Sequence, residues 1–266
     1  MKSAMPNKWG QSRLYLPGKV WLIGAGPGDP ELLTLKAVRA LGEADVVVTD
    51  DLVNPAILAH APHARVVQAG KRGGCTSTPQ AFIDKLMIRC AKRGLTVARL
   101  KGGDPFMFGR GGEELLALTA AGIEVEVVSG ITAGMGVTAA LGIPVTHRDV
   151  ARGVTFITGH TRDGADPDWR ALVASGTTLV VYMGLANLPR IARALLDADM
   201  PGTMPAAAIQ DGTTARQKKV ISSLARIEGD VTAAGIASPA LLVFGGVVAL
   251  AQAVAEASQN IMRAAA

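Results

Sequence analysis

The sequence predicts an α/β protein made of two α/β domains. Short apolar runs, typical of buried strands, alternate along the chain with apolar patterns of helical period. Glycine-rich turns follow several of these runs, as in α/β sheets that bind a ligand at the ends of their strands. The alternation breaks near Gly142-Ile143-Pro144 and then restarts, so we expect an N-terminal α/β domain over residues 19–143 and a C-terminal one over residues 144–258. Residues 1–18 and 259–266 are predicted to be a flexible tail and a frayed end.

The first domain is predicted from five strand-like runs and the helical patterns between them. A hydroxyl cap, an early proline and Gln80 predict a helix that starts near Ser77, runs to about Arg93 and stops at Gly94. Because connections of helix length separate the strands, we expect parallel pairing. The helix after the first strand is expected to bury Leu32, Leu33, Leu35 and Val38. The strands are expected at Val20–Ile23, Val46–Thr49, Arg65–Gln68, Thr96–Leu100 and Val125–Val128.

The second domain repeats the same kinds of pattern. Helical stretches are predicted near Trp169–Ala174, Leu188–Asp197 and Ala249–Ala257. The segment Gln217–Ile227 is compatible with either a strand or a helix. The strands are expected at Val154–Thr158, Thr178–Met183, Ala206–Gln210 and Leu241–Phe244.

Composition narrows the class of protein. Of the 266 residues 49% are hydrophobic and 18% charged, a balance that supports a sizeable buried core rather than disorder. The formal net charge of +5 raises the alternative of a basic nucleic-acid-binding protein. The basic residues are scattered, however, and the aromatic residues on which single strands stack make up only 4%. We therefore expect no nucleic acid as a partner, and a small polyanionic substrate instead.

Membrane, metal and redox roles find little support in the sequence. The uncharged stretches Val127–Thr146 and Ser238–Ala255 are interrupted by glycine and proline, so we expect no membrane partner. Cys75 and Cys90 fit free thiols in a reducing compartment, which favours a cytoplasmic location. The four histidines are too dispersed for metal-ligand spacing, and no metal is predicted.

Glycine-rich turns are the strongest chemical signal, because a backbone without Cβ atoms can approach a ligand closely. The first turn has the spacing G-x-G-x-G with Pro27 and Pro30 nearby, which does not fit the dinucleotide fingerprint G-x-G-x-x-G. No G-K-[ST] follows it, so a phosphate-binding P-loop is excluded as well. The turns are Gly24–Asp29, Gly102–Pro105, Gly109–Gly112, Gly130–Gly136 and Gly245-Gly246.

Six stretches around these turns resemble the precorrin (tetrapyrrole) methyltransferase superfamily. Val20–Leu35 and Arg99–Glu114 resemble the superfamily as a whole. The other four are similar to its uroporphyrinogen-III C-methyltransferases: Lys71–Gly74, Ser129–Asp149, Ala151–His160 and Ala208–Gln217. The resemblance implies the tetrapyrrole methylase fold, with S-adenosyl-L-methionine in the cleft between the two α/β domains, S-adenosyl-L-homocysteine as the product, and a homodimer.

The implied activity is methylation of uroporphyrinogen III at two ring carbons. The resemblance implies that the reaction forms precorrin-1 and then precorrin-2, on the route to sirohaem or cobalamin. Another precorrin methyltransferase of the same superfamily is the nearest alternative. A nucleic-acid-binding protein is the alternative of a different class.

Roles for single residues follow from the resemblance. Asp50 and Lys71 match the proposed proton acceptor and donor. Arg110, His147 and Arg148 match motifs near the substrate, whose carboxylates arginine is suited to bind. Asp51 stands where many relatives have arginine, which reverses the charge beside Asp50. The positions that match cofactor contacts are Pro27, Gly102, Gly103, Asp104, Met107, Thr132, Ala133, Met183 and Gly212.

Overall fold

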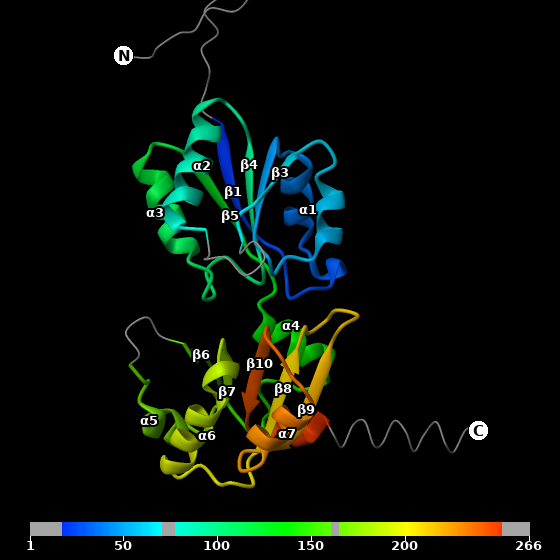
Figure 1. Ribbon diagram of the computed structural model, residues 1–266, viewed down its shortest axis with the longest axis vertical. Helices are drawn as coiled ribbons and strands as arrows, with labels where there is room; N and C mark the ends of the chain where they lie inside the picture. Colours follow the sequence, from blue (N-terminus) through cyan, green and yellow to red (C-terminus); the bar gives the residue numbers. More distant parts are fainter. Residues whose placement is uncertain (1–17, 71–77, 161–164, 252–266) are drawn as a thin grey trace, which may run out of the picture. The chain divides into compact units, whose positions relative to one another are not determined.

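A computed structural model describes residues 18–70, 78–160 and 165–251. The predicted tail up to residue 17, Lys71, Cys75 and the predicted frayed end lie outside the described residues. Contacts between Cα atoms divide the chain into two compact units, Met1–Thr132 and Ala133–Ala266, and each contains its own sheet (Figure 1).

The first unit contains a fully parallel five-stranded sheet. Its strand order is β3-β2-β4-β1-β5. Because every pair is parallel, the carboxyl ends of all five strands lie at one edge. Predicted parallel pairing is thus confirmed, and the predicted strands agree with the observed ones to within one residue at either end. The strands are β1 (Lys19–Gly24), β2 (Val46–Thr49), β3 (Arg65–Gln68), β4 (Val97–Lys101) and β5 (Glu124–Val128).

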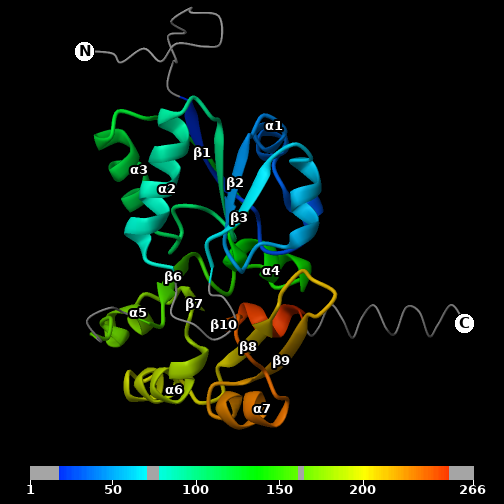
Figure 2. The ribbon, with the colours of Figure 1, turned by 45° about the horizontal axis from the view of Figure 1, so that its top comes forward.

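Helices cover both faces of this sheet, as Figure 2 shows. Helix α1 (Leu35–Gly42) and the 3-10 helix η2 (Pro55–His60) bury one face, where Ile23, Val47 and Leu100 contribute to the core. Helices α2 (Gln80–Lys92) and α3 (Gly111–Ala120) bury the other face. Successive strand residues point to opposite faces, which is why the strands of this sheet read as continuous apolar runs.

Two details of the predicted helices differ from the structure. The stretch after β1 divides into a 3-10 helix, η1 (Pro30–Leu32), and α1, because Leu33 is extended and Thr34 caps α1 by accepting a hydrogen bond from the amide of Ala37 (3.1 Å). Leu35 is therefore 91% exposed rather than buried. Helix α2 starts after Pro79 without a side-chain cap, and it ends before Gly94, which has the expected positive φ of 84°.

The second unit has a mixed sheet in the order β6-β7-β10-β8-β9. Strands β6 and β7 are parallel, whereas β10 runs antiparallel to both β7 and β8, and β8 is antiparallel to β9. The ambiguous segment at 217–227 forms a strand and then the start of a helix. The strands are β6 (Val154–Thr158), β7 (Thr178–Tyr182), β8 (Pro205–Gln210), β9 (Lys218–Ser223) and β10 (Ala240–Phe244).

Helices also cover both faces of the second sheet. Helix α4 (Ala133–Ala140) packs on one face, where Val137 joins a cluster with Val180 and Ile209. The amide of Gly134 also donates a 2.6 Å hydrogen bond to the Tyr182 hydroxyl. These contacts assign α4 to the second unit, so the division falls before Ala133 and not near the predicted residues 143 and 144. The other face carries α5 (Trp169–Ala174), the 3-10 helix η3 (Leu185–Asn187), α6 (Leu188–Asp197) and α7 (Ile227–Ala233).

In the part of the chain that the structure describes, no helix is long and apolar enough to cross a bilayer.

Candidate active site

The carboxyl edge of the first sheet gathers most of the predicted site residues of that unit. Pro27 follows β1, Asp50 follows β2, and the turn Gly102-Gly103-Asp104 follows β4. Thr132 lies in the segment after β5. Because the strands are parallel, their ends meet at this edge although the residues are far apart in sequence. Lys71, the predicted proton donor, lies outside the described residues.

Backbone pairing between two glycine turns forms the centre of this edge. The Gly26 amide donates to the carbonyl oxygen of Gly103 (3.1 Å), and the Gly103 amide donates to that of Gly26 (2.8 Å). Both residues have positive φ, 72° and 68°, a conformation that favours glycine. The pairing therefore explains why glycine occurs in both turns after β1 and β4.

A third turn, which contains Gly130, packs against these two with backbone atoms in close contact. A Cβ atom added at Gly24 would lie 2.6 Å from the carbonyl oxygen of Gly103, and one added at Gly130 would collide with the same oxygen. A Cβ at Gly102 would come within 2.8 Å of Cβ of Leu52, in the loop after β2. The edge is thus a surface of closely packed main chain, which a side chain at these glycines would disrupt.

Asp104 connects the turn after β4 to the segment after β5. Its Oδ1 accepts a hydrogen bond from the amide of Phe106 (2.8 Å), and its Oδ2 accepts one from the amide of Gly130 (3.1 Å). The carboxylate therefore has a structural function that the sequence does not reveal. Its predicted contact with the cofactor stays a prediction.

Asp50 is half-buried at the end of β2. Its Oδ1 accepts a hydrogen bond from the amide of Leu52 (3.1 Å), which fixes the carboxylate relative to the loop that follows. The same loop is tied to the first glycine turn, because the Asn54 amide group donates to the carbonyl oxygen of Gly28 (2.8 Å). The predicted proton acceptor thus belongs to a segment that these two hydrogen bonds hold in place.

Arg110 begins α3 in a left-handed conformation, with φ of 59°. Its Nε and Nη2 both donate to the Glu113 carboxylate, at 3.0 and 2.6 Å. Hydrogen bonding to Glu113 raises the pKa of Arg110 above its ordinary value, against the smaller effect of burial, so the guanidinium stays charged. The pair is about half exposed, which leaves the cation accessible to an anion.

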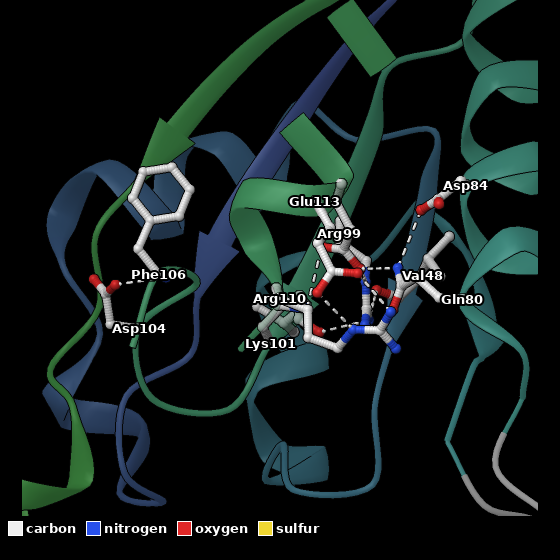
Figure 3. Close-up of polar contacts among 11 residues, drawn as sticks. Val48, Gln80, Asp84, Arg99, Lys101, Asp104, Phe106, Arg110 and Glu113 are labelled. Atoms are coloured by element: carbon white, nitrogen blue, oxygen red, sulfur yellow. Dashed lines mark hydrogen bonds and ion pairs between the residues drawn. The ribbon is translucent and has the colours of Figure 1, made fainter. Parts of the chain in front are cut away.

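Beneath this edge lies a buried charge cluster that the sequence did not predict (Figure 3). Glu114 of α3 is fully buried and lies between Arg99 and Lys101 of β4, each 4% exposed. Arg99 Nε donates to Glu114 Oε1 (3.0 Å), to which the Gln80 side-chain amide also donates (2.9 Å). Lys101 Nζ lies 3.1 Å from Glu114 Oε2, an ionic contact without good hydrogen-bond alignment at that oxygen.

Burial and charge act against each other in this cluster. Burial lowers the pKa of Lys101, and repulsion from Arg99 lowers it further, against the attraction of Glu114 and Asp50. Burial alone would raise the pKa of Glu114. The charges of Arg99 and Lys101 and the hydrogen bond from Gln80 outweigh burial and hold the pKa of Glu114 below its ordinary value.

In the second unit, three predicted cofactor positions lie toward one edge of the sheet. Met183 follows β7 with φ of 53° and is 52% exposed, and Gly212 follows β8. Strand β10 pairs with the ends of both strands, so these ends share an edge. Ala133 begins α4, which meets that edge where Gly134 contacts Tyr182 and where a Cβ at Gly212 would collide with Val137.

The predicted substrate residues His147 and Arg148 lie in a turn before β6. The His147 amide donates to the carbonyl oxygen of Ala151 (2.8 Å), and His147 Nδ1 accepts from the Asp149 amide (3.2 Å). Arg148 lines a polar cavity of about 650 Å³, together with Arg152, Gly153, Ser175 and Thr177. This cavity lies at the amino ends of β6 and β7, so the structure does not bring Arg148 to the edge that carries Met183.

Within residues 18–70, 78–160 and 165–251, no three side chains of histidine, cysteine, aspartate or glutamate are grouped so that they could hold a metal ion.

The chain is similar to known proteins over most of its length. Residues 19–228 match the Tetrapyrrole (Corrin/Porphyrin) Methylases. The chain is 56% identical over 232 residues to a uroporphyrinogen-III C-methyltransferase of Pseudomonas aeruginosa, covering 87% of this chain and 95% of that protein. It is 49% identical to a siroheme synthase of Azotobacter vinelandii, of which it spans 51%. Uroporphyrin-III C-methyl transferase of Thermus thermophilus, solved with S-adenyl homocysteine, has a TM-score of 0.75 and 41% identity, covering 87% of this chain and 93% of that one.

Proposed function

Because the chain belongs to the tetrapyrrole (corrin/porphyrin) methylase family, we propose that it is an S-adenosylmethionine-dependent methyltransferase acting on uroporphyrinogen III. The reaction adds methyl groups to two ring carbons and gives precorrin-2 by way of precorrin-1. The observation that carries the proposal is 56% identity to a uroporphyrinogen-III C-methyltransferase over nearly the whole length of that protein.

The main-chain surface at the first sheet edge fits the proposed cofactor. Its glycines let the main chains of three turns pack closely where added Cβ atoms would collide, and a backbone without Cβ atoms can approach a ligand. In the second unit, Met183 is about half exposed at the same sheet edge that carries Gly212. S-adenosylmethionine, when bound, supplies an electrophilic methyl group on a sulfonium. The residues that would hold it are Pro27, Gly102, Gly103, Asp104, Met107, Thr132, Ala133, Met183 and Gly212.

The side chains of this protein would position the substrate and move a proton. Alignment of the reacting atoms is the main contribution expected from any such site. Asp50 is proposed to accept the proton that leaves the substrate, and Lys71 to donate one. Arg110 supports the proposal as an accessible cation, and Arg110, His147 and Arg148 are proposed to bind substrate carboxylates.

Incubation with uroporphyrinogen III and isotopically labelled S-adenosylmethionine tests the proposal directly. We expect mass analysis to show first one and then two labelled methyl groups on the tetrapyrrole. A parallel incubation with a later precorrin distinguishes this function from the nearest alternative, which is methylation of a later precorrin by another enzyme of the same family. Methylation of that substrate alone would assign the chain to another reaction of the same family.

A cytoplasmic homodimer is proposed from the family alone. Light scattering on the eluate of a size-exclusion column tests the dimer, because it measures the mass in solution. Fractionation of the producing cells tests the location.

A further inference from the structure

The geometry points to Lys101 as a positioning residue for Asp50. We infer that Lys101, next to Asp50 by strand register, links the Asp50 carboxylate electrostatically to the buried Arg99–Glu114 pair and holds it in place for proton acceptance. The inference rests on the proposed function and adds a residue to it.

Strand register places the two residues side by side. Strands β2 and β4 are parallel neighbours in which Thr49 pairs with Leu100, so the next position brings Asp50 beside Lys101. Val48, two residues before Asp50, belongs to the core on the face of α2 and α3. Arg99, two residues before Lys101, contacts α3 on that face. By alternation, Asp50 and Lys101 continue the same face.

The charges in the cluster leave one cation without a full partner. Arg99 and Lys101 are both buried, yet they share the single carboxylate of Glu114. Glu114 also accepts from Gln80, so its oxygens serve three donor groups. An isolated buried cation is costly, and a second carboxylate nearby relieves that cost. Asp50 is the further acid whose charge favours the Lys101 ammonium.

The other charged groups near Lys101 are already engaged. Glu113 is held by Arg110 at the start of α3. Asp84 of α2 accepts from the Gln80 side-chain amide (3.0 Å). Asp50 differs from both because it lies at the open edge of the sheet, where the substrate is proposed to bind. Lys101 therefore links the buried cluster to the reacting edge.

Two substitutions that remove one buried cation each provide a matched comparison. Lys101→Met and Arg99→Met each leave Glu114 with one cationic partner, but only Lys101→Met deprives Asp50 of its neighbour. Arg99 also donates to the carbonyl oxygens of Val48 and Leu100 (both 3.3 Å), so Arg99→Met is expected to lower the melting temperature more.

The kinetic result expected for Lys101→Met is a loss in the chemical step. We expect kcat to fall by about 10-fold or more, while the KM for uroporphyrinogen III changes less than about two-fold. The affinity for S-adenosylhomocysteine should also change less than about two-fold, and Lys101→Arg should restore kcat. Arg99→Met should leave kcat within about two-fold of the wild-type value. Equal losses of kcat in both variants, or no loss in Lys101→Met, would overturn the inference.

A titration without substrate tests the same link independently of activity. The Lys101 side chain can be followed by NMR in protein labelled at lysine Cε, with its signal assigned by its loss in Lys101→Met. Asp50→Asn should move the midpoint of the Lys101 titration to lower pH, because a favourable charge is lost. Asp51→Asn is the control, since Asp51 is adjacent and its carboxylate lies against Gly70.

The two experiments separate the possible failures. If the wild-type protein does not methylate uroporphyrinogen III, the proposed function fails, and the titration still decides whether Lys101 and Asp50 interact. An unchanged midpoint in Asp50→Asn refutes the interaction whatever the activity. If Lys101→Met does not fold, Lys101→Gln replaces it in the kinetic comparison.

Discussion

At the scale of single residues, Asp104 shows how one carboxylate can join two loops. It accepts backbone hydrogen bonds from Phe106 and Gly130, which belong to the segments after β4 and β5. In the sequence, Asp104 follows two glycines and precedes a proline, which indicates a turn. The resemblance to the family adds a predicted contact with the cofactor. The long-range bond to Gly130 could not be read there, because it depends on β4 and β5 both lying next to β1.

Replacing Asp104 tests this structural function. Asp104→Ala leaves two amides without their acceptor, and we expect it to lower the free energy of unfolding by about 1–2 kcal/mol in urea titrations. Asp104→Asn keeps one acceptor oxygen and should lose less. Asp104→Ala should also weaken binding of S-adenosylhomocysteine, measured by calorimetry. An alanine variant with wild-type stability would show that water replaces the carboxylate.

Asp50 is expected to act in the chemical step of methyl transfer. Asp50→Asn is nearly isosteric and keeps the oxygen that accepts from Leu52, so packing and cofactor affinity should persist. Only the charge and the basicity are lost. Single-turnover methyl transfer should therefore slow by roughly 10²-fold or more for both methylations.

The neighbouring residue provides the comparison for this prediction. Asp51→Asn removes the same charge one position later and should leave the single-turnover rate near that of the wild type. A rate for Asp50→Asn that is also near wild type would exclude Asp50 as the base. Proton removal would then fall to water or to the carboxylates of the substrate.

At the scale of elements, β4 and α3 are joined by charge where sheets and helices usually meet through apolar side chains. Arg99, Lys101 and Glu114 lie within the apolar layer that α2 and α3 form on the sheet. Sequence patterns could not predict this cluster, because a charged residue in a strand or helix indicates a solvated position unless its partner is known. The partner, Glu114, belongs to a different element, and only the packing of α3 on β4 brings them together.

The cluster makes the stability of the first unit depend on pH. The folded pKa of Glu114 lies below its ordinary value of 4.5, so its stabilising contribution is complete above that value and is lost as the pH falls through the folded pKa. The pKa of Lys101 is lowered from 10.5, so the unfolded chain binds more protons in the alkaline window below 10.5 and stability rises with pH there.

Hydrogen exchange at the amides of β4 measures this dependence locally. We expect protection to fall more steeply in the wild type than in Glu114→Gln as the pH drops below 4.5, because the glutamine cannot titrate at this position. Glu114→Gln should also be less stable at pH 7, because two buried cations lose their counter-charge. Parallel pH profiles for the two proteins would show that other carboxylates dominate acid unfolding.

At the scale of the whole molecule, the sequence predicted the strands well and the site in part. Short runs such as Val46–Thr49 are apolar on both faces and bounded by polar residues, so their limits were predictable. The position of Arg148 was not, because it depends on which end of β6 and β7 the preceding turn reaches. The family suggested by the motifs is confirmed by the match over residues 19–228.

Ligand-induced stabilisation distinguishes the proposed class of protein from a nucleic-acid-binding one. S-adenosylhomocysteine at 100 times its dissociation constant should raise the free energy of unfolding by about 2.7 kcal/mol, since it binds the folded state alone. A short DNA or RNA duplex at the same concentration should leave the melting temperature unchanged. The reverse pattern in a thermal-shift measurement would contradict the methyltransferase assignment.

The strand order of the first sheet also constrains how the chain can fold during synthesis. Strands β1 and β2 are consecutive in sequence but do not pair with each other, because β4 lies between them. Until the ribosome has released residues 97–101, only β2 and β3 can form their native pairing. The loop that joins β1 to β4 must close before β1 gains its first native partner, at an entropic cost that local contacts do not offset. We therefore expect the nascent first unit to remain without its central strand pairs, and dependent on chaperones for protection, until nearly all of it has been made.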